Sequence, residues 1–382
     1  MTAVLAAGCT KSGLIETPST QSGPITFDPY LGKLPVTKAE NSDLTALQKA
    51  ITADQYSGGF QVYAFLHGAN NADPTSFTST YMNEEVWWEN AKWEYNKVTY
   101  WPEGAQLAFA AFGLNAAKSG CLVRKDQSAT PALNEYTFTV KEKVSDQVDL
   151  IVAPYQTGLS EGNVSLNFKH LLSRIGFKVM STDGTDGVNI AIKSIVLHGA
   201  FPTTGDVDIT LTDSESGLPY ISNKTGLQED YTLFEGSDCF LVSSTECATA
   251  ESAKPIYANM TVSGDTYSPK YVAENFTENL PDGVTAVEVA QEASVKAQNN
   301  RYMMIMPCEL DENAFIEVSY QLTSDKVRKA KVDLKNFEFV AGCAYEFILK
   351  VSASAIVFDA TMSTDWESAG IPAVPLPLTP EN

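Results

Sequence analysis

Residues 164–180 read VSLNFKHLLSRIGFKVM, and this stretch separates two β-rich halves of the chain. Apolar and polar residues alternate up to Phe168, which is the pattern of a strand with one buried face. After Leu171 and Leu172 the alternation resumes on the opposite parity, with Ile175 as its first apolar member. A change of parity requires a bulge or a bend. We therefore predict a long strand that bends between Leu171 and Ser173 and opens the second half.

The length of 382 residues exceeds that of one β-sandwich and favours two domains. The 16 Tyr and 18 Phe suit sheets better than helical bundles. We predict an all-β protein with tandem β-sandwich domains over residues 24–163 and 164–368. Residues 1–23 would form a signal and tether, and residues 369–382 a Pro-rich tail.

Two local elements stand out before residue 60. Ser42 is a suitable N-cap for a short helix over residues 43–51, whose Leu and Ile residues share one face. Ahead of it, the sequence ITFDPYLGK alternates up to Phe27 and then contains Pro29. Because proline cannot donate to a central ladder, this segment is predicted to be an edge strand.

The formal net charge of −21 excludes nucleic acid and anionic membrane surfaces as partners, since both would be repelled. No apolar run reaches the roughly 20 residues of a membrane-spanning helix. The start MTAVLAAGC instead resembles a bacterial lipoprotein signal in which Cys9 becomes lipidated. The alternative is an ordinary N-terminus with an incidental cysteine.

Five cysteines remain beyond Cys9, an odd number that fits no complete disulfide framework. Cys239 and Cys247 could bridge adjacent segments, but buried free thiols are the expected state. The three histidines, at positions 67, 170 and 198, lie in or beside apolar strands and are interpreted as structural. We expect no metal site, no cofactor and no enzymatic activity, although a carboxylate pair of glycosidase type is defined only in space.

The densest group of aromatic residues lies between positions 87 and 101. Trp87, Trp88 and Trp101 could stack on sugar rings if they are exposed, which would make the protein a glycan-binding surface lipoprotein. If they are buried, they are large side chains of a sandwich core.

Taken in order, several motifs resemble the fimbrillin superfamily, also called Mfa-like, whose members form the type V pili of Bacteroidetes. The motifs are LAAGC, ITFDPY, GGFQVYAFL, KWEYNKVTYWPEGAQLAFAAFG, VDLIVAP, VSLNFKHLLSRIGFKV, IKSIVLHG, RYMMIMPCEL and AGCAYEFILKV. The resemblance implies two transthyretin-like β-sandwich domains, export as a lipoprotein to the outer membrane and cell surface, and assembly with other fimbrial subunits. Assembly would proceed by strand exchange after a protease removes an N-terminal strand.

Carried onto this chain, the resemblance makes Ile25, Thr26 and Phe27 the displaced strand. The processing site would fall between Lys38 and Ala39 in VTKAE, where the family commonly has Arg. The tail IPAVPLPLTPEN contains four prolines and is predicted to be a poor donor strand. The leading hypothesis is therefore a tip-like or accessory fimbrial subunit that adheres to a host or bacterial surface glycan or protein, and the runner-up is the glycan-binding lipoprotein.

Overall fold

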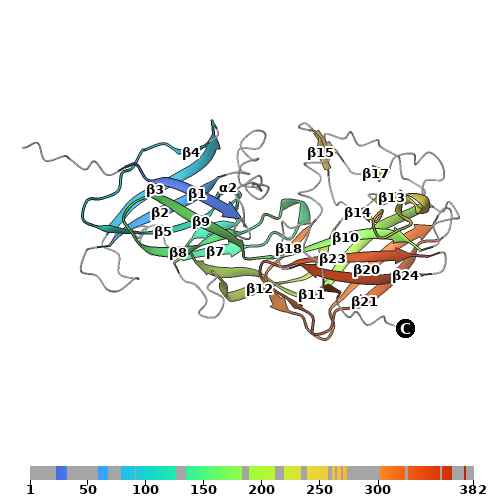
Figure 1. Cartoon of the computed structure of the whole chain (residues 1–382). Helices are drawn as coiled ribbons and strands as arrows, with labels where there is room; N and C mark the ends of the chain where they lie inside the picture. Colours follow the sequence, from blue (N-terminus) through green and yellow to red (C-terminus); the bar gives the residue numbers. More distant parts are fainter. Residues whose placement is uncertain are drawn as a thin grey trace, which may run out of the picture.

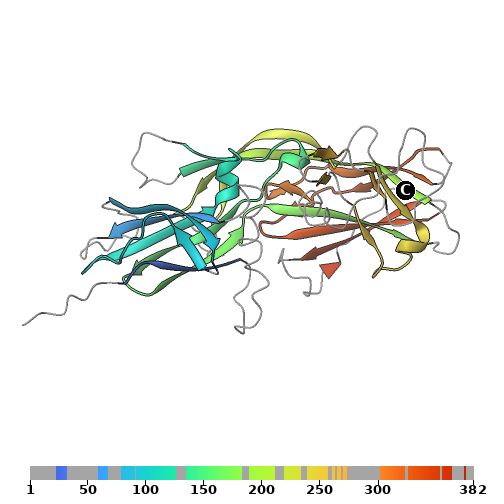
Figure 2. The same ribbon diagram turned by 90° about the horizontal axis from the view of Figure 1, so that it is seen from above.

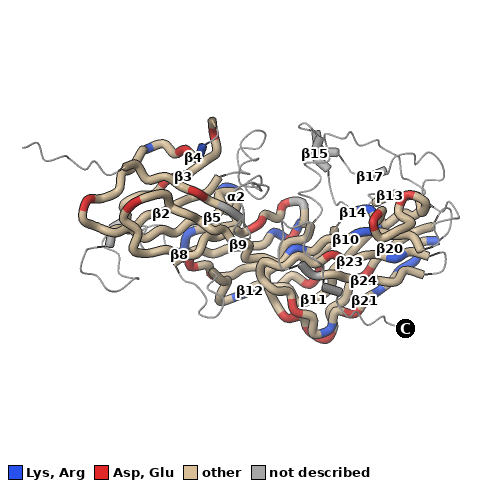
Figure 3. The backbone as a smooth tube through the Cα atoms, viewed as in Figure 1, with Lys and Arg blue, Asp and Glu red and all other residues tan. Residues whose placement is uncertain are grey.

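The computed structural model describes an elongated all-β protein with one group of strands at each end (Figures 1 and 2). The described residues are 23–31, 59–67, 79–90, 92–125, 135–182, 189–210, 219–233, 239–256, 260–262, 265–267, 270–272, 302–322, 326–352, 355–363 and 374–375. Asp and Glu residues occur along the backbone at both ends of the molecule (Figure 3).

A seven-stranded sheet forms the N-terminal end. Its spatial order is β1 (Thr26–Leu31), β9 (Asn163–His170), β8 (Ile151–Leu159), β5 (Gln106–Gly113), β2 (Phe60–His67), β3 (Ser79–Glu89) and β4 (Lys92–Tyr95). The helix α2 (Leu114–Lys118) follows β5.

Two further sheets pack face to face toward the C-terminal end. The eight-stranded sheet runs β17 (Lys270–Val272), β13 (Cys239–Ser243), β11 (Asn189–Asp208), β20 (Phe315–Leu322) and β21 (Arg328–Asp333). Two further strands, β12 (Ile221–Thr232) and β7 (Glu135–Thr139), pair with β11, and β6 (Leu122–Arg124) pairs with β7. The six-stranded sheet runs β14 (Lys254–Pro255), β10 (Ser173–Ser181), β23 (Ala344–Val351), β24 (Ile356–Ser363) and β25 (Val374–Pro375), with β18 (Met303–Ile305) on β10.

Short elements complete the described part of the chain. They are the pairs β15 (Met260–Val262) with β16 (Asp265–Tyr267) and β19 (Cys308–Glu309) with β22 (Glu338–Phe339), and the 3-10 turns at Val144–Asp146 and Ser244–Cys247.

The central strands of the seven-stranded sheet are buried on both faces. On β5, Leu107, Phe109 and Ala111 point to one side and the residues between them point to the other. The first side belongs to a compact group that we call the N-terminal cluster: Ile25, Phe27, Phe60, Val62, Ala64, Met82, Val86, Trp101, Leu107, Phe109, Ala111, Ala153, Val164, Leu166 and Phe168. The other side joins a larger main core that continues without a break through the C-terminal sheets.

The stretch 164–180 bends where the parity change predicts. β9 ends at His170 and β10 begins at Ser173, so the break falls at Leu171 and Leu172. Both leucines are buried in the main core. The two strands enter different sheets, because β9 pairs with β1 and β8, whereas β10 pairs with β14, β18 and β23. The stretch therefore closes the N-terminal sheet before it opens the C-terminal one.

The predicted boundary between residues 163 and 164 falls within β9, a strand of the N-terminal sheet. No single cut separates the sheets, because β11 is 20 residues long and serves both ends. Its first half pairs with β13 and β20, and its last residues pair with β7 and β12. The physical reason is that one long strand can add to two sets of partners along its length.

Other predictions have mixed outcomes. The helix expected at residues 43–51 lies outside the described residues, and α2 was not anticipated. Cys121, Cys247 and Cys343 are buried free thiols, and Cys308 is a partly buried one. Cys247 is thus not joined to Cys239, and burial raises the pKa of its thiol.

Candidate functional site

β1 is the last strand in the order of the seven-stranded sheet, and the residues just before it, Gly23 to Ile25, contact backbone on the side away from β9. On one side it pairs in parallel with β9 over six residues, from Thr26 opposite Asn163 to Leu31 opposite Phe168. On the other side, the amide of Ile25 donates to the Thr99 carbonyl at 2.8 Å. The amide of Trp101 donates to the Gly23 carbonyl at 3.2 Å, and Pro24 forms an isolated bridge with Tyr100. β1 therefore closes the gap between β9 and residues 99–101.

The inward side chains of β1 complete the N-terminal cluster. Ile25 is 0% exposed and Phe27 is 7% exposed. The Phe27 ring packs edge-on against three others, with centroid distances of 5.7 Å to Phe60, 5.8 Å to Tyr95 and 6.3 Å to Phe109. Edge-to-face pairs of this kind add to the stabilisation from burial alone. The strand is thus an integral wall of the cluster as well as an edge.

Tyr95, the last residue of β4, fixes the position of this strand. Its hydroxyl donates to the Ile25 carbonyl at 2.7 Å and accepts from the Thr99 amide at 3.3 Å. Burial raises the pKa of Tyr95 above its ordinary value, because desolvation disfavours the phenolate. The bond joins the two ends of the seven-stranded sheet.

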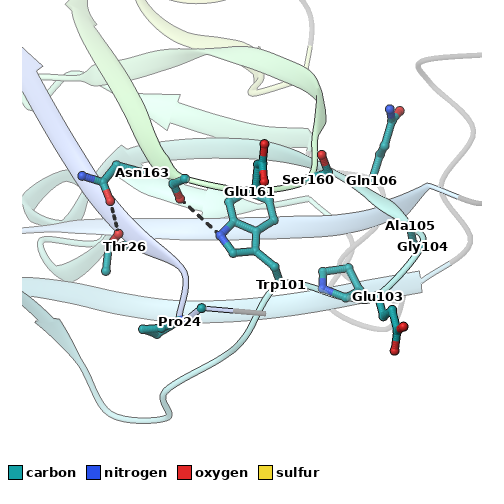
Figure 4. Close-up of a pocket in the computed structure, with 13 residues that line it drawn as sticks. Pro24, Thr26, Trp101, Glu103, Gly104, Ala105, Gln106, Ser160, Glu161 and Asn163 are labelled. Atoms are coloured by element: carbon teal, nitrogen blue, oxygen red, sulfur yellow. Dashed lines mark hydrogen bonds between the residues drawn. The ribbon is translucent and has the colours of Figure 1, made fainter. Parts of the chain in front are cut away.

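A pocket of about 900 Å³ lies where β1 begins (Figure 4). The indole of Trp101 lines it and donates its Nε1 hydrogen to the Gly162 carbonyl at 3.2 Å. Beside it, the Thr26 hydroxyl donates to the side-chain oxygen of Asn163. The other walls are the turns that hold Glu103 and Glu161, so the pocket is the entrance to the space that β1 fills.

We use the name β1 slot for the space that residues 23–31 occupy. β9 lies on one side of this space, and Tyr95 with residues 99–101 lies on the other. Its chemistry is that of binding an extended peptide: backbone groups on both sides and apolar positions beneath.

The tryptophans that were considered for glycan contact differ in exposure. Trp101 is 4% exposed, so its ring is packed in the N-terminal cluster and is not free to stack on a sugar. Trp87 and Trp88 are half-buried on β3, and Trp88 packs edge-on against Trp93 at 5.3 Å. Glycan contact at Trp87 and Trp88 stays a prediction, which a glycan array comparing the protein with its Trp88→Ala variant would test.

Two of the three histidines form pairs with carboxylates. His170 Nδ1 lies 2.5 Å from Asp149 Oδ2, and His198 Nδ1 lies 2.5 Å from Asp230 Oδ1. The His198 ring also stacks on Phe315 at 4.2 Å. The side chain of His67 lies outside the described residues. Within the part of the chain that is described, no group of three or more His, Cys, Asp or Glu is arranged to hold a metal ion.

The predicted lipidation and processing residues, Cys9, Lys38 and Ala39, lie outside the described residues. Ile25, Thr26 and Phe27 lie together at the start of a paired outer strand, and displacement of that strand stays a prediction. Sequence reasoning missed Tyr95. The run KWEYNKVTYWP contains it, but the partner of its hydroxyl lies 70 residues away, and local pattern does not reveal it.

No helix in the described residues is long and apolar enough to span a membrane. The fold is all-β, and the main core joins its two ends. At the N-terminal end, β1 occupies the β1 slot. The profile of the fimbrillin-like family matches residues 49–276, more than half of the chain. The protein therefore belongs to the fimbrillin-like family. No curated protein matches the sequence.

Comparison with solved structures finds similar chains at low sequence identity. A fimbrial protein from Bacteroides vulgatus is 16% identical with a TM-score of 0.51, covering 89% of this chain and 98% of its own. A candidate cell adhesion protein from Bacteroides uniformis is 12% identical with a TM-score of 0.46, covering 90% of this chain and 99% of its own. At these identities, the first likeness supports the fold and nothing further.

Proposed function

We propose that this protein is a non-enzymatic fimbrial subunit of the cell surface that assembles by strand exchange at the β1 slot. Cleavage between Lys38 and Ala39 would release β1 from the rest of the chain, and a strand of another subunit would take its place. The observation that carries this proposal is that β1 closes the N-terminal cluster between two backbone walls. Membership of the fimbrillin-like family supports the same function.

The energetics favour refilling of an emptied slot. Loss of β1 would expose the apolar positions now covered by Ile25 and Phe27 and the open edge of β9. Burying one such side chain contributes about 1.5–3 kcal/mol, and an unpaired strand edge is a template for another chain. An incoming strand with suitable side chains recovers both contributions.

The C-terminal tail supports a tip-like or accessory position. Val374 and Pro375 pair with β24 of the same chain over only two residues. The tail contains four prolines within IPAVPLPLTPEN, each of which lacks an amide donor. A subunit that accepts a strand but donates poorly would end a polymer rather than continue it.

In this proposal, the N-terminus anchors the protein to the membrane. Lipidation of Cys9 would hold the precursor at the outer membrane until cleavage separates the anchor from the assembled subunit. The adhesive partner would be a host or bacterial surface glycan or protein. A Cys9→Ser variant is expected to move from the membrane fraction to the soluble fraction, and an unchanged distribution would remove Cys9 as the anchor.

Strand exchange is tested by cutting the protein at Lys38 and mixing it with a homologous stalk subunit. We expect a complex that survives denaturing gel loading without heat and dissociates on boiling. Uncut protein is the control and is expected to stay monomeric. Cut protein that stays monomeric with every donor tried would rule out this mechanism.

A further inference from the structure

The two walls of the β1 slot use different residues of the strand. Ile25 donates its amide to Thr99 at 2.8 Å, and its carbonyl accepts from Tyr95 at 2.7 Å. In a strand, both polar groups of one residue point to the same side, and the side alternates along the chain. Thr26 and every second residue after it therefore face β9, and the ladder with β9 depends on their amides.

The same alternation fixes the side chains. Ile25, Phe27 and Pro29 are buried and share one phase, and their amide positions all point away from β9. This accounts for a proline in the middle of a six-residue ladder, because Pro29 removes no hydrogen bond to β9. Thr26 and Asp28 are exposed and carry the amides that β9 requires.

As a deepening of the strand-exchange function, we propose that the β1 slot selects its incoming strand by the phase of its prolines. A strand that fits carries apolar residues at alternate positions, tolerates proline only in that apolar phase, and has none at the positions that face β9. It runs in the direction of β1. The residue that replaces Ile25 must fill the same apolar position and also bond to Thr99 and Tyr95. If the strand were reversed with that side chain still pointing inward, the amide of the residue would point toward β9.

In the direction of β1, the chain's own tail either breaks this rule or loses packing in the N-terminal cluster. When Val374, Leu376 and Leu378 fill the core positions, Pro375 and Pro377 face β9 and two donors are lost. A shift by one residue restores the donors but places a proline where Phe27 packs against three rings. The partner of the slot is therefore a strand from a different protein, with apolar residues at positions i, i+2 and i+4 and no proline between them.

Peptide exchange on the full chain tests the rule. A protease site introduced within residues 33–38 is cut, which leaves β1 bound without a covalent link. A fluorescent peptide of residues 23–31 is then exchanged into the slot in urea below the unfolding transition, and anisotropy reports binding. The unlabelled competitors are the same peptide, its Asp28→Ala and Asp28→Pro variants, its Pro29→Ala variant, and a peptide of residues 371–382.

The expected order of competition among the peptides follows from which of their residues face β9. The Asp28→Ala and Pro29→Ala peptides should compete within about threefold of the parent, since neither removes a donor to β9. Asp28→Pro should compete about tenfold less well or worse, because one buried backbone bond is lost. The tail peptide should not displace the label at about a hundredfold excess.

The outcomes separate the two proposals. If the parent peptide itself never enters the cut protein, the slot is not exchangeable and the proposed function fails. If the parent enters but Asp28→Pro competes as well as Asp28→Ala, the phase rule is wrong while strand exchange stands. Competition by the tail peptide at the level of the parent would also overturn the rule, because it would mean a strand running opposite to β1.

Discussion

Both ends of the chain place a strand on the outside of a sheet, but the two strands are held very differently. β1 pairs with β9 over six residues and contacts residues 99–101 on its other side. β25 pairs with β24 over two residues, one of which is Pro375. The first strand completes a hydrophobic cluster, whereas the second adds a short ladder to a sheet that is already built.

The difference shows where the molecule concentrates its stability at an edge. Removing an edge strand that fills core positions costs much free energy, so binding of another strand in its place is strongly favoured. Removing a two-residue strand costs little free energy, so binding of a replacement strand is only weakly favoured. An exchangeable strand at the N-terminal end and a dispensable one at the C-terminal end are the consequences to be tested.

The largest effect is expected from Phe27→Ala. Truncating a buried phenylalanine costs about 3–5 kcal/mol of unfolding free energy, through lost burial and the cavity left behind. Urea unfolding followed by tryptophan fluorescence would report it, since Trp93 and Trp101 both pack in or against the N-terminal cluster. Asp28→Ala, at an exposed position of the same strand, is the matched control and should change stability by no more than about 0.5 kcal/mol. A Phe27→Ala cost below about 1 kcal/mol would contradict the role of β1 as a wall of the cluster.

A smaller effect is expected from Tyr95→Phe. The substitution removes the hydroxyl that bonds the Ile25 carbonyl and keeps the ring beside Phe27. The expected loss is about 1 kcal/mol, and the release of β1 from cut protein should accelerate. Tyr100→Phe is the control, because that ring is 46% exposed. Equal release rates for the two variants would show that the hydroxyl does not hold the strand.

The smallest effect is expected from deleting residues 371–382. Among the described residues of this segment two ladder positions are lost, so the unfolding free energy should fall by less than about 1 kcal/mol. Amide hydrogen exchange should rise in β24 at Thr361 and Met362 and stay unchanged in β23. A larger loss of stability would mean that the tail is as integral to its sheet as β1 is to the other, and the contrast between the ends would disappear.

The main core ties the two ends together and limits how far they act separately. Leu171 and Leu172 lie in this core at the point where β9 gives way to β10. β11 crosses the same region and pairs at both ends of the molecule. The buried residues of β1 therefore belong to a cluster that is separate from the main core, while the scaffold around it is continuous.

The sequence alone determined the local features. The parity change in residues 164–180 predicted the break at Leu171 and Leu172, since alternation reports which face of a strand is buried. The alternation of Ile25 and Phe27 before Pro29 predicted an outer strand. The all-β class followed from the density of such segments. Each of these depends on neighbours within a few residues.

Only the tertiary structure decided which strands pair. Thr26 lies opposite Asn163, 137 residues away, and Tyr95 bonds Ile25 across 70 residues. Periodicity shows that a residue is buried but not against what, so the sequence placed the domain boundary within β9 and left the exposure of Trp101 open. For the same reason the sequence did not reveal that Tyr95 and residues 99–101 form the second wall of the β1 slot. The slot forms only when strands that are distant in the sequence have paired.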